Sequence, residues 1–343
     1  MIEQVIGRLL VFGLAALVAF VLSLALVVVL RPWLARRALA RPNARSSHRE
    51  PTPQGGGIAV VTATLVVAWV GIALWPPFAQ SQGSQFFALT AAAVVLAVVG
   101  AVDDAQPLPE APRLALQFVA VGAAIAALPN DWHVLPQLPW SIERALVFLG
   151  LVWFVNVVNF MDGIDWMTVA EVVPITGALA LLGICGTIGP LPTLLSAALL
   201  GGMLGFAPSN KPVARLFLGD AGSLPIGLLL GWLLLALASV GYPAAALILP
   251  LYYLADATVT LALRIARREP FWQAHRSHFY QRATDNGFTV PEIITRVALV
   301  NLALAALAFI TVAAQNLIVS LAALAAAFAV VAWLLGIFAH RER

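Results

Sequence analysis

Two adjacent carboxylates, Asp103 and Asp104, end an apolar run that begins near residue 86. Like charges this close repel each other, and a nearby apolar phase disfavours their ionised forms. A divalent cation or a cationic partner would relieve both penalties. The alternative is a solvated helix end. We favour a catalytic role, because ionisable groups at the edge of the membrane phase usually serve function.

Two amides and two acids follow another apolar run, at Asn156, Asn159, Asp162 and Asp165. The two asparagines are three residues apart and share one helix face, and Asp162 with Gly163 is typical of a turn. The alternative is hydrogen bonding between helices by asparagine. Because amides and acids occur together, we predict that this stretch binds a polar ligand.

Asp220 lies between Gly219 and Gly222, directly before a further apolar run. A helix N-terminus attracts phosphate oxygens, and a carboxylate beside them could hold Mg²⁺. The alternative is an ordinary Asp N-cap with packing glycines. We predict a phosphate site here, with Asp220 as the metal ligand.

A short basic loop carries His275, Arg276, His278 and Arg282. Two histidines and two arginines suit an anionic diphosphate. A zinc site is an alternative, but no cysteine or third clustered histidine accompanies the pair. A basic patch on anionic lipid is the other alternative. We favour the diphosphate.

Two further features are weaker. The segment from His48 to Gly57 contains Pro51-Thr-Pro53 followed by three glycines, which predicts an extended entry into a closely packed helix. Asp256 lies inside an apolar run about two helical turns from Arg264. Such an acid needs a partner, and we expect it to lock the helices near the site.

These residues must be positioned by membrane-spanning helices. The chain has 343 residues, of which 62% are hydrophobic and only 10% charged, against about 25% charged in a soluble domain. Eleven apolar stretches are long enough to cross a bilayer. They cover residues 5–30, 57–75, 86–102, 113–129, 143–159, 166–184, 191–207, 223–240, 243–264, 291–314 and 316–338. The predicted fold is one all-α, polytopic transmembrane bundle over residues 1–343.

Basic residues fix the predicted orientation. In this arrangement 17 of the 19 Lys and Arg residues lie on one side, with only Arg8 and Arg144 on the other. The positive-inside rule then puts the N-terminus in the periplasm and the C-terminus in the cytoplasm. The candidate residues fall on the cytoplasmic side, in loops 31–56, 103–113, 156–166, 208–222 and 265–290.

In these five stretches the sequence resembles the polyprenyl-phosphate N-acetylhexosamine-1-phosphate transferases of glycosyltransferase family 4. The matching pieces occur in family order: Pro51-Thr-Pro-Gln-Gly-Gly-Gly57, Asp103-Asp104, Asn156-x-x-Asn159-x-x-Asp162-Gly163, Phe217-Leu-Gly-Asp220-Ala-Gly-Ser223 and the histidine loop. The family includes initiators of O-antigen and enterobacterial common antigen, and the phospho-N-acetylmuramoyl-pentapeptide transferase. The eleven-span arrangement resembles the initiators.

The resemblance implies a set of roles. It implies a UDP-N-acetylhexosamine donor, an undecaprenyl phosphate acceptor, membrane lipid around the chain and Mg²⁺ as cofactor, with Mn²⁺ as an alternative. Asp103, Asp104 and His278 match catalytic positions, and Asp220 matches the metal ligand. Substrate-binding roles are expected for Asn156, Asn159, Asp162, Phe217, Arg276 and Arg113, with Phe217 stacking on uracil.

The histidine loop departs from the initiator pattern. It reads His275-Arg-Ser-His278-Phe-Tyr280-Gln281, without the later histidines of the initiators or the triple histidine of the pentapeptide transferase. That sequence resembles the branch that handles 6-deoxy sugars such as FucNAc or QuiNAc in O-antigen synthesis. UDP-GlcNAc is the alternative donor.

The sequence therefore predicts an enzyme of the bacterial inner membrane. It would transfer N-acetylhexosamine-1-phosphate to undecaprenyl phosphate at the cytoplasmic face and release UMP. No nucleic acid partner is expected, and a homodimer is left open. The rival of another class is a secondary transporter, but such proteins place polar residues near the midplane, often with inverted repeats. Here the polar clusters lie at helix ends.

Overall fold

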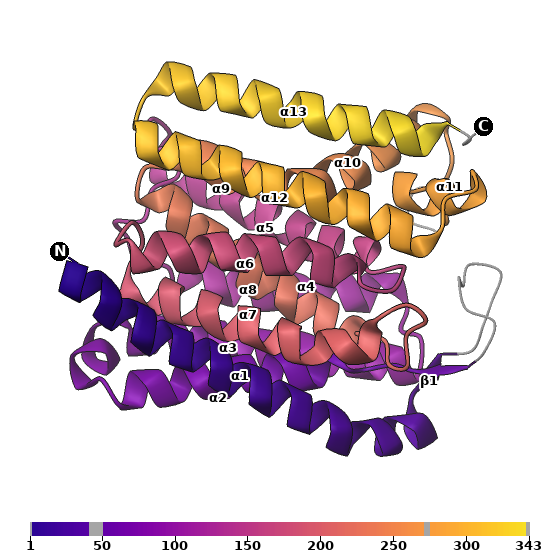
Figure 1. Ribbon diagram of the computed structural model, residues 1–343, viewed down its shortest axis with the longest axis horizontal. Helices are drawn as coiled ribbons and strands as arrows, with labels where there is room; N and C mark the ends of the chain where they lie inside the picture. Colours follow the sequence, from indigo (N-terminus) through magenta and orange to yellow (C-terminus); the bar gives the residue numbers. More distant parts are fainter. Residues whose placement is uncertain (1, 41–50, 271–274, 341–343) are drawn as a thin grey trace.

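The computed structural model describes residues 2–40, 51–270 and 275–340. Within them the regular secondary structure is helical apart from a two-residue antiparallel pairing of β1 (Leu39–Ala40) with β2 (Thr52–Pro53). The long helices run roughly parallel to one another, and β1, α11 and the C-terminus lie at the end opposite the N-terminus (Figure 1). The all-α architecture predicted from the sequence is confirmed.

The helices follow the apolar segments of the sequence. They are α1 (Ile2–Arg37), α2 (Gly57–Ala73), α3 (Pro76–Ala105), α4 (Glu110–Ala126), α5 (Trp140–Met161), α6 (Met167–Ile184), α7 (Pro190–Asn210), α8 (Asp220–Ser239), α9 (Pro243–Ile248), α10 (Leu251–Ala266), α11 (Phe279–Asp285), α12 (Val290–Ala314) and α13 (Leu317–Ala339).

Eight of the helices in the described residues are long and apolar enough to cross a membrane: α1, the Gln82–Ala105 part of α3, α5, α6, α7, α8, α12 and α13. The helix α2 is apolar but shorter, with 17 residues. The protein is therefore a multi-pass membrane protein.

One predicted span is wrong as a single helix. The stretch 243–264 is divided into α9 and α10, and Leu249 and Pro250 form a turn between them. Pro250 has no backbone N–H to donate, and its ring clashes with the preceding helical turn, which favours a break at this position. Every other predicted span coincides with one helix.

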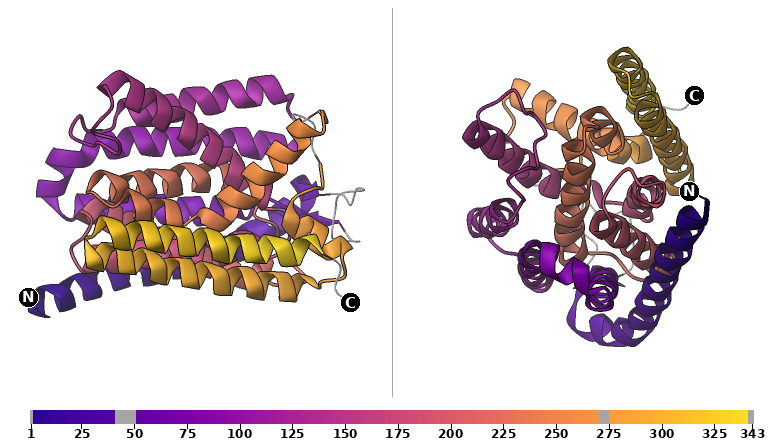
Figure 2. Two further views of the ribbon diagram at one scale, coloured as in Figure 1. Left: turned by 90° about the horizontal axis from the view of Figure 1, so that it is seen from above. Right: turned by 90° about the vertical axis from the view of Figure 1, so that its left-hand side faces the viewer.

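The interior helix is α8, which is apolar on all sides and has almost every residue buried. A helix of this kind must be surrounded by other helices, and α3, α5, α2 and α9 pack around it. By contrast, α1 and α13 lie at the rim of the bundle when it is viewed end-on (Figure 2). The N-terminus of α8 is therefore held rigidly, and Asp220 is its first residue.

Candidate active site

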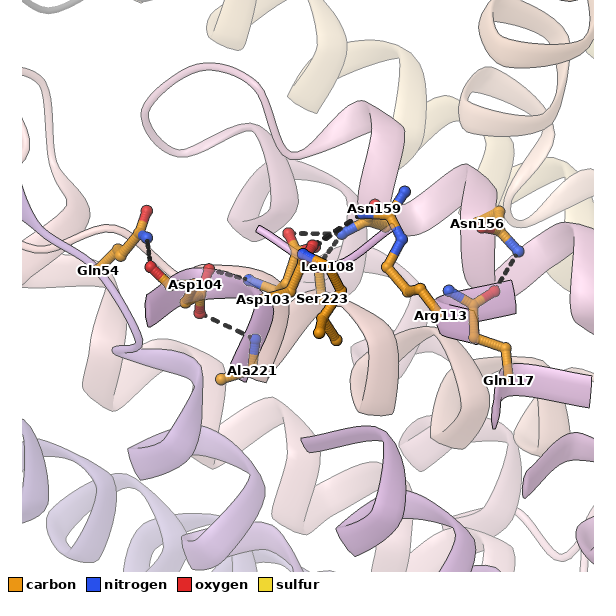
Figure 3. Close-up of polar contacts among 11 residues, drawn as sticks. Gln54, Asp103, Asp104, Leu108, Arg113, Gln117, Asn156, Asn159, Ala221 and Ser223 are labelled. Atoms are coloured by element: carbon orange, nitrogen blue, oxygen red, sulfur yellow. Dashed lines mark hydrogen bonds and ion pairs between the residues drawn. The ribbon is translucent and has the colours of Figure 1, made fainter. Parts of the chain in front are cut away.

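The ends of α3 and α8 meet at an acidic centre, which we define as Asp103, Asp104 and Asp220 with Arg113 and Asn159. Both carboxylate oxygens of Asp104 accept hydrogen bonds from the first amides of α8, at 3.0 Å from Asp220 N and 3.1 Å from Ala221 N (Figure 3). The side chain thus binds two of the amides that have no partner inside the helix. Asp104 fixes the end of α3 to the start of α8.

Glycines make this approach feasible. A Cβ added to Gly100 would overlap the backbone of Asp220 and Ala221, and one added to Gly57 would overlap Gly222. Gly219 has a φ of +74°, which residues with a side chain rarely adopt, and a Cβ there would meet the Asp104 carboxylate. Backbone contact between α2, α3 and α8 therefore requires glycine at these positions.

Arg113, in the first turns of α4, lies between two of the carboxylates. Its Nη1 is 2.8 Å from Asp103 Oδ2 and 3.6 Å from Asp220 Oδ2. The other oxygen of Asp103 accepts a hydrogen bond from the Leu108 amide at 2.6 Å. One guanidinium therefore offsets the repulsion of two carboxylates, which is the role that a cation was predicted to play here.

The two asparagines of α5 have separate partners. Asn159 Nδ2 donates to Asp220 Oδ1 at 2.8 Å and to the Ser223 hydroxyl at 2.9 Å. Asn156 donates to Gln117 Oε1 on α4 at 2.7 Å (Figure 3). The shared helix face predicted for the pair thus joins α5 both to the acidic centre and to the helix that carries Arg113.

Asp162 is half-buried at the end of α5 and accepts a hydrogen bond from Thr168. Burial raises the pKa of its carboxyl to about 7, and the negative charges of Asp104 and Asp165 act in the same direction. The neighbouring Asp165 instead binds the Ala214 amide at 2.9 Å. The charge of Asp104, which belongs to the acidic centre, therefore acts on the carboxyl of Asp162.

The segment 51–57 lies against the same centre. Gln54 Nε2 donates to the backbone carbonyl of Asp104 at 2.6 Å, and the Gly56 amide donates to the Phe217 carbonyl at 2.9 Å. Phe217 is half-buried and precedes Asp220 by three residues in the sequence. The first residues of the predicted segment, 48–50, lie outside the described residues.

The histidine loop also lies against the end of α5. His278 is buried, and its ring stacks on Phe160 with 6.4 Å between centroids. Arg276 donates to the Thr284 hydroxyl at 2.9 Å and pairs with Asp285 at 3.3 Å. His278 thus contacts Phe160, which follows Asn159 of the acidic centre. Arg276 instead binds two residues of α11. Residues 271–274 of the predicted loop lie outside the described part.

Sequence reasoning assigned no role to Gln54, Gln117 or Ser223, although each binds a predicted site residue. Gln54 lies in the 51–57 motif and Ser223 in the 217–223 motif, each next to a glycine. A polar side chain at such a position was the feature from which a role in the site could have been predicted. Gln117 is a single polar residue in an apolar helix, and only its partner Asn156 explains it.

The donor atoms of the centre fit a hard divalent cation. Among the described residues no group of three or more His, Cys, Asp or Glu side chains gathers as a metal site. The centre instead offers two carboxylates, Asp103 and Asp220, with the amide of Asn159. Mg²⁺ is usually held by one or two carboxylates and completes its shell with water and substrate phosphates, which matches this set.

The class that the fold and centre define is a polytopic membrane enzyme with an acidic site at one end of the bundle. Glycosyl transferase family 4 matches residues 86–238, which include Asp103, Asp104, Asn159 and Asp220.

Curated relatives agree over a larger part of the chain. A phospho-N-acetylmuramoyl-pentapeptide-transferase of Synechococcus sp. (strain JA-3-3Ab) is 32% identical over 67% of this chain and 71% of its own length. A probable undecaprenyl-phosphate N-acetylglucosaminyl 1-phosphate transferase of Bacillus subtilis is 28% identical, over 77% and 76%. A decaprenyl-phosphate N-acetylglucosaminephosphotransferase of Mycolicibacterium smegmatis is 31% identical, over 57% and 52%.

The chain belongs to glycosyl transferase family 4 and is an enzyme of the phosphotransferase type.

Proposed function

We propose that this protein transfers a sugar-1-phosphate from a UDP-sugar to a polyprenyl phosphate and releases UMP. The observation that carries the proposal is the meeting of Asp103, Asp104 and Asp220 at the ends of two helices, with Arg113 between two of them. The names of the relatives in the same family support the lipid phosphate as acceptor and a sugar phosphate as the transferred group.

The reaction exchanges one phosphoanhydride for another. An oxygen of the lipid phosphate forms a bond to the β-phosphorus of the UDP-sugar, and the bond from that phosphorus to the oxygen of UMP breaks. Little net energy is required, so the protein must position the two phosphates and offset their charge. Arg113 lies between two carboxylates, and the guanidinium has further N–H groups that could donate to a phosphate oxygen.

The cofactor that we propose is Mg²⁺, with Mn²⁺ as an alternative. When bound, it would offset the negative charge of the diphosphate, held by Asp220 with the Asn159 amide and Asp103 beside it. The remaining residues act by position. Because both oxygens of Asp104 bind the backbone of α8, this side chain orients Asp220, and Asp103 is the acid left to orient the lipid phosphate.

The finer assignments follow the sequence. We propose undecaprenyl phosphate as the acceptor, the bacterial inner membrane as the location and its cytoplasmic face as the side of the site, in O-antigen or another cell-envelope polysaccharide pathway. Support comes from the position of the acidic centre beside β2, at the end of the bundle where α1 ends in Arg36 and Arg37.

For the donor we propose a 6-deoxy N-acetylhexosamine of the FucNAc or QuiNAc type. The departure of residues 275–281 from the initiator pattern supports it, and the ring of Phe160, which stacks on His278, leaves an exposed apolar face beside this loop. The names of the Bacillus and Mycolicibacterium relatives favour UDP-GlcNAc instead.

Purified protein with polyprenyl phosphate should release UMP from a UDP-sugar, and removal of divalent cations with EDTA should stop the release. A secondary transporter would release no UMP under these conditions. Direct competition between UDP-GlcNAc and a UDP-6-deoxy-HexNAc then decides the donor. A site that hydrogen-bonds a 6-hydroxyl rejects the deoxy sugar strongly. Equal or faster use of UDP-GlcNAc would overturn the 6-deoxy assignment and leave the transferase proposal intact.

A further inference from the structure

A fully buried carboxylate, Asp256, lies in the interior of α10 and binds the start of α11. Its oxygens accept hydrogen bonds from the backbone amides of Phe279 at 2.9 Å and Tyr280 at 3.1 Å. The hydroxyls of Thr260 and Tyr252 contact the same carboxylate at 3.3 and 3.4 Å. The family resemblance assigns no role to this residue, although its burial has a free-energy cost that four donors offset.

The imidazole of His278 meets the same carboxylate. His278 Nδ1 is 3.4 Å from Asp256 Oδ1, within the range of an ion pair although not aligned as a hydrogen bond. The ring is held between Phe160, Tyr280 and His275, with interplanar angles of 29°, 19° and 33°. One edge of the ring therefore faces Asp256, and three neighbouring rings restrict its rotation.

The start of α11 is also attached to the end of α5. The Tyr280 hydroxyl donates to the Phe160 carbonyl at 3.1 Å, and Gly163 leaves room for that hydroxyl because a Cβ there would overlap it. Phe160 follows Asn159, which binds Asp220. The ring of His278 is thus fixed relative to the acidic centre through a short, rigid path.

We propose that Asp256 is a positioning residue for His278: it binds the Nδ1 edge of the imidazole and the first amides of α11, so that Nε2 is directed to the substrate phosphates beside the acidic centre. The inference rests on the proposed function. A carboxylate next to Nδ1 orients the ring, so that the opposite nitrogen, Nε2, is directed away from Asp256. The other titratable groups that face this pair are His275, Tyr252 and Tyr280.

A double-mutant cycle tests this arrangement. Asp256→Asn should lower kcat about 10- to 100-fold with little change in KM for the donor, the range typical of losing a partner that orients a histidine. In a His278→Asn background the same change should cost less than about twofold, because a residue acting through His278 has nothing left to position. Thr260→Val is the matched control: it removes one donor to Asp256 and should leave kcat within about threefold.

A second pair of variants keeps Asp256 intact, in case Asp256→Asn does not fold. Asparagine at position 278 can reach Asp256 as Nδ1 does but lacks an atom at the place of Nε2, whereas the longer glutamine can reach that place. We expect His278→Gln to retain at least about tenfold more activity than His278→Asn at equal thermal stability.

Additive losses in the cycle, unchanged kcat in Asp256→Asn, or equal activity of the two His278 variants would each overturn the positioning role while the wild type still releases UMP. Absence of UMP release by the wild type would overturn the proposed function and this inference with it.

Discussion

The change Gly100→Ala should separate α3 from α8 at the acidic centre. The added Cβ would lie well inside 3.0 Å of the Asp220 carbonyl and the Ala221 nitrogen, whereas ordinary contacts of a Cβ begin at 3.4 Å. Both neighbours are backbone atoms, so no flexible side chain can move aside. The two helix ends must separate by about 1 Å, a misplacement that can cost roughly 100-fold in rate.

The same displacement affects stability. The hydrogen bonds from Asp104 to α8, now 3.0 and 3.1 Å, would lengthen beyond useful range. Overpacking of this kind typically costs about 1–3 kcal/mol. Initial rates of UMP release and thermal unfolding of the purified protein measure the two effects.

Gly150→Ala is the matched control. Gly150 also lies inside a helix, α5, but a Cβ there meets nothing within 4 Å. Both variants gain about the same helix propensity, roughly 1 kcal/mol, so a difference between them reports the α3–α8 contact. Near-normal activity of Gly100→Ala, or equal losses in both variants, would refute the reasoning.

Three further outcomes are expected. Asp220→Asn should abolish UMP release in a folded protein, since the amide lacks the charge that a hard cation needs; near-normal turnover at saturating Mg²⁺ would remove Asp220 from the metal role. Arg113→Gln should make the unfolding temperature more dependent on Mg²⁺ than in the wild type, because two carboxylates lose their shared cation; an unchanged dependence would contradict this. The raised pKa of Asp162, about 7, means that the folded state binds more protons than the unfolded state between roughly pH 4 and pH 7. Stability from this group therefore falls as the pH rises through that window, and Asp162→Asn should flatten the fall in metal-free thermal unfolding; identical pH profiles of the two proteins would refute it.

The sequence by itself determined the elements. Long apolar runs have few ways to satisfy their backbone groups in a bilayer except as helices, so the spans and the all-α class followed from composition and length. Asp103, Asn159 and Asp220 stood out for the same reason: polar groups at the ends of apolar helices need a local explanation. Pro250 could also be read from the sequence, but the stretch 243–264 was predicted as one continuous span, whereas the structure has a break at Pro250 between α9 and α10.

Only the tertiary structure decided which partner each of these side chains binds. Asp103 and Asp104 are neighbours in sequence, yet one faces Arg113 and the other binds the backbone of α8, because successive side chains of a helix point in different directions. The carboxylate of Asp256 and the amide of Phe279 are 23 positions apart along the chain. Their contact depends on how α10 and α11 pack, and side-chain periodicity within a single segment carries no information about that.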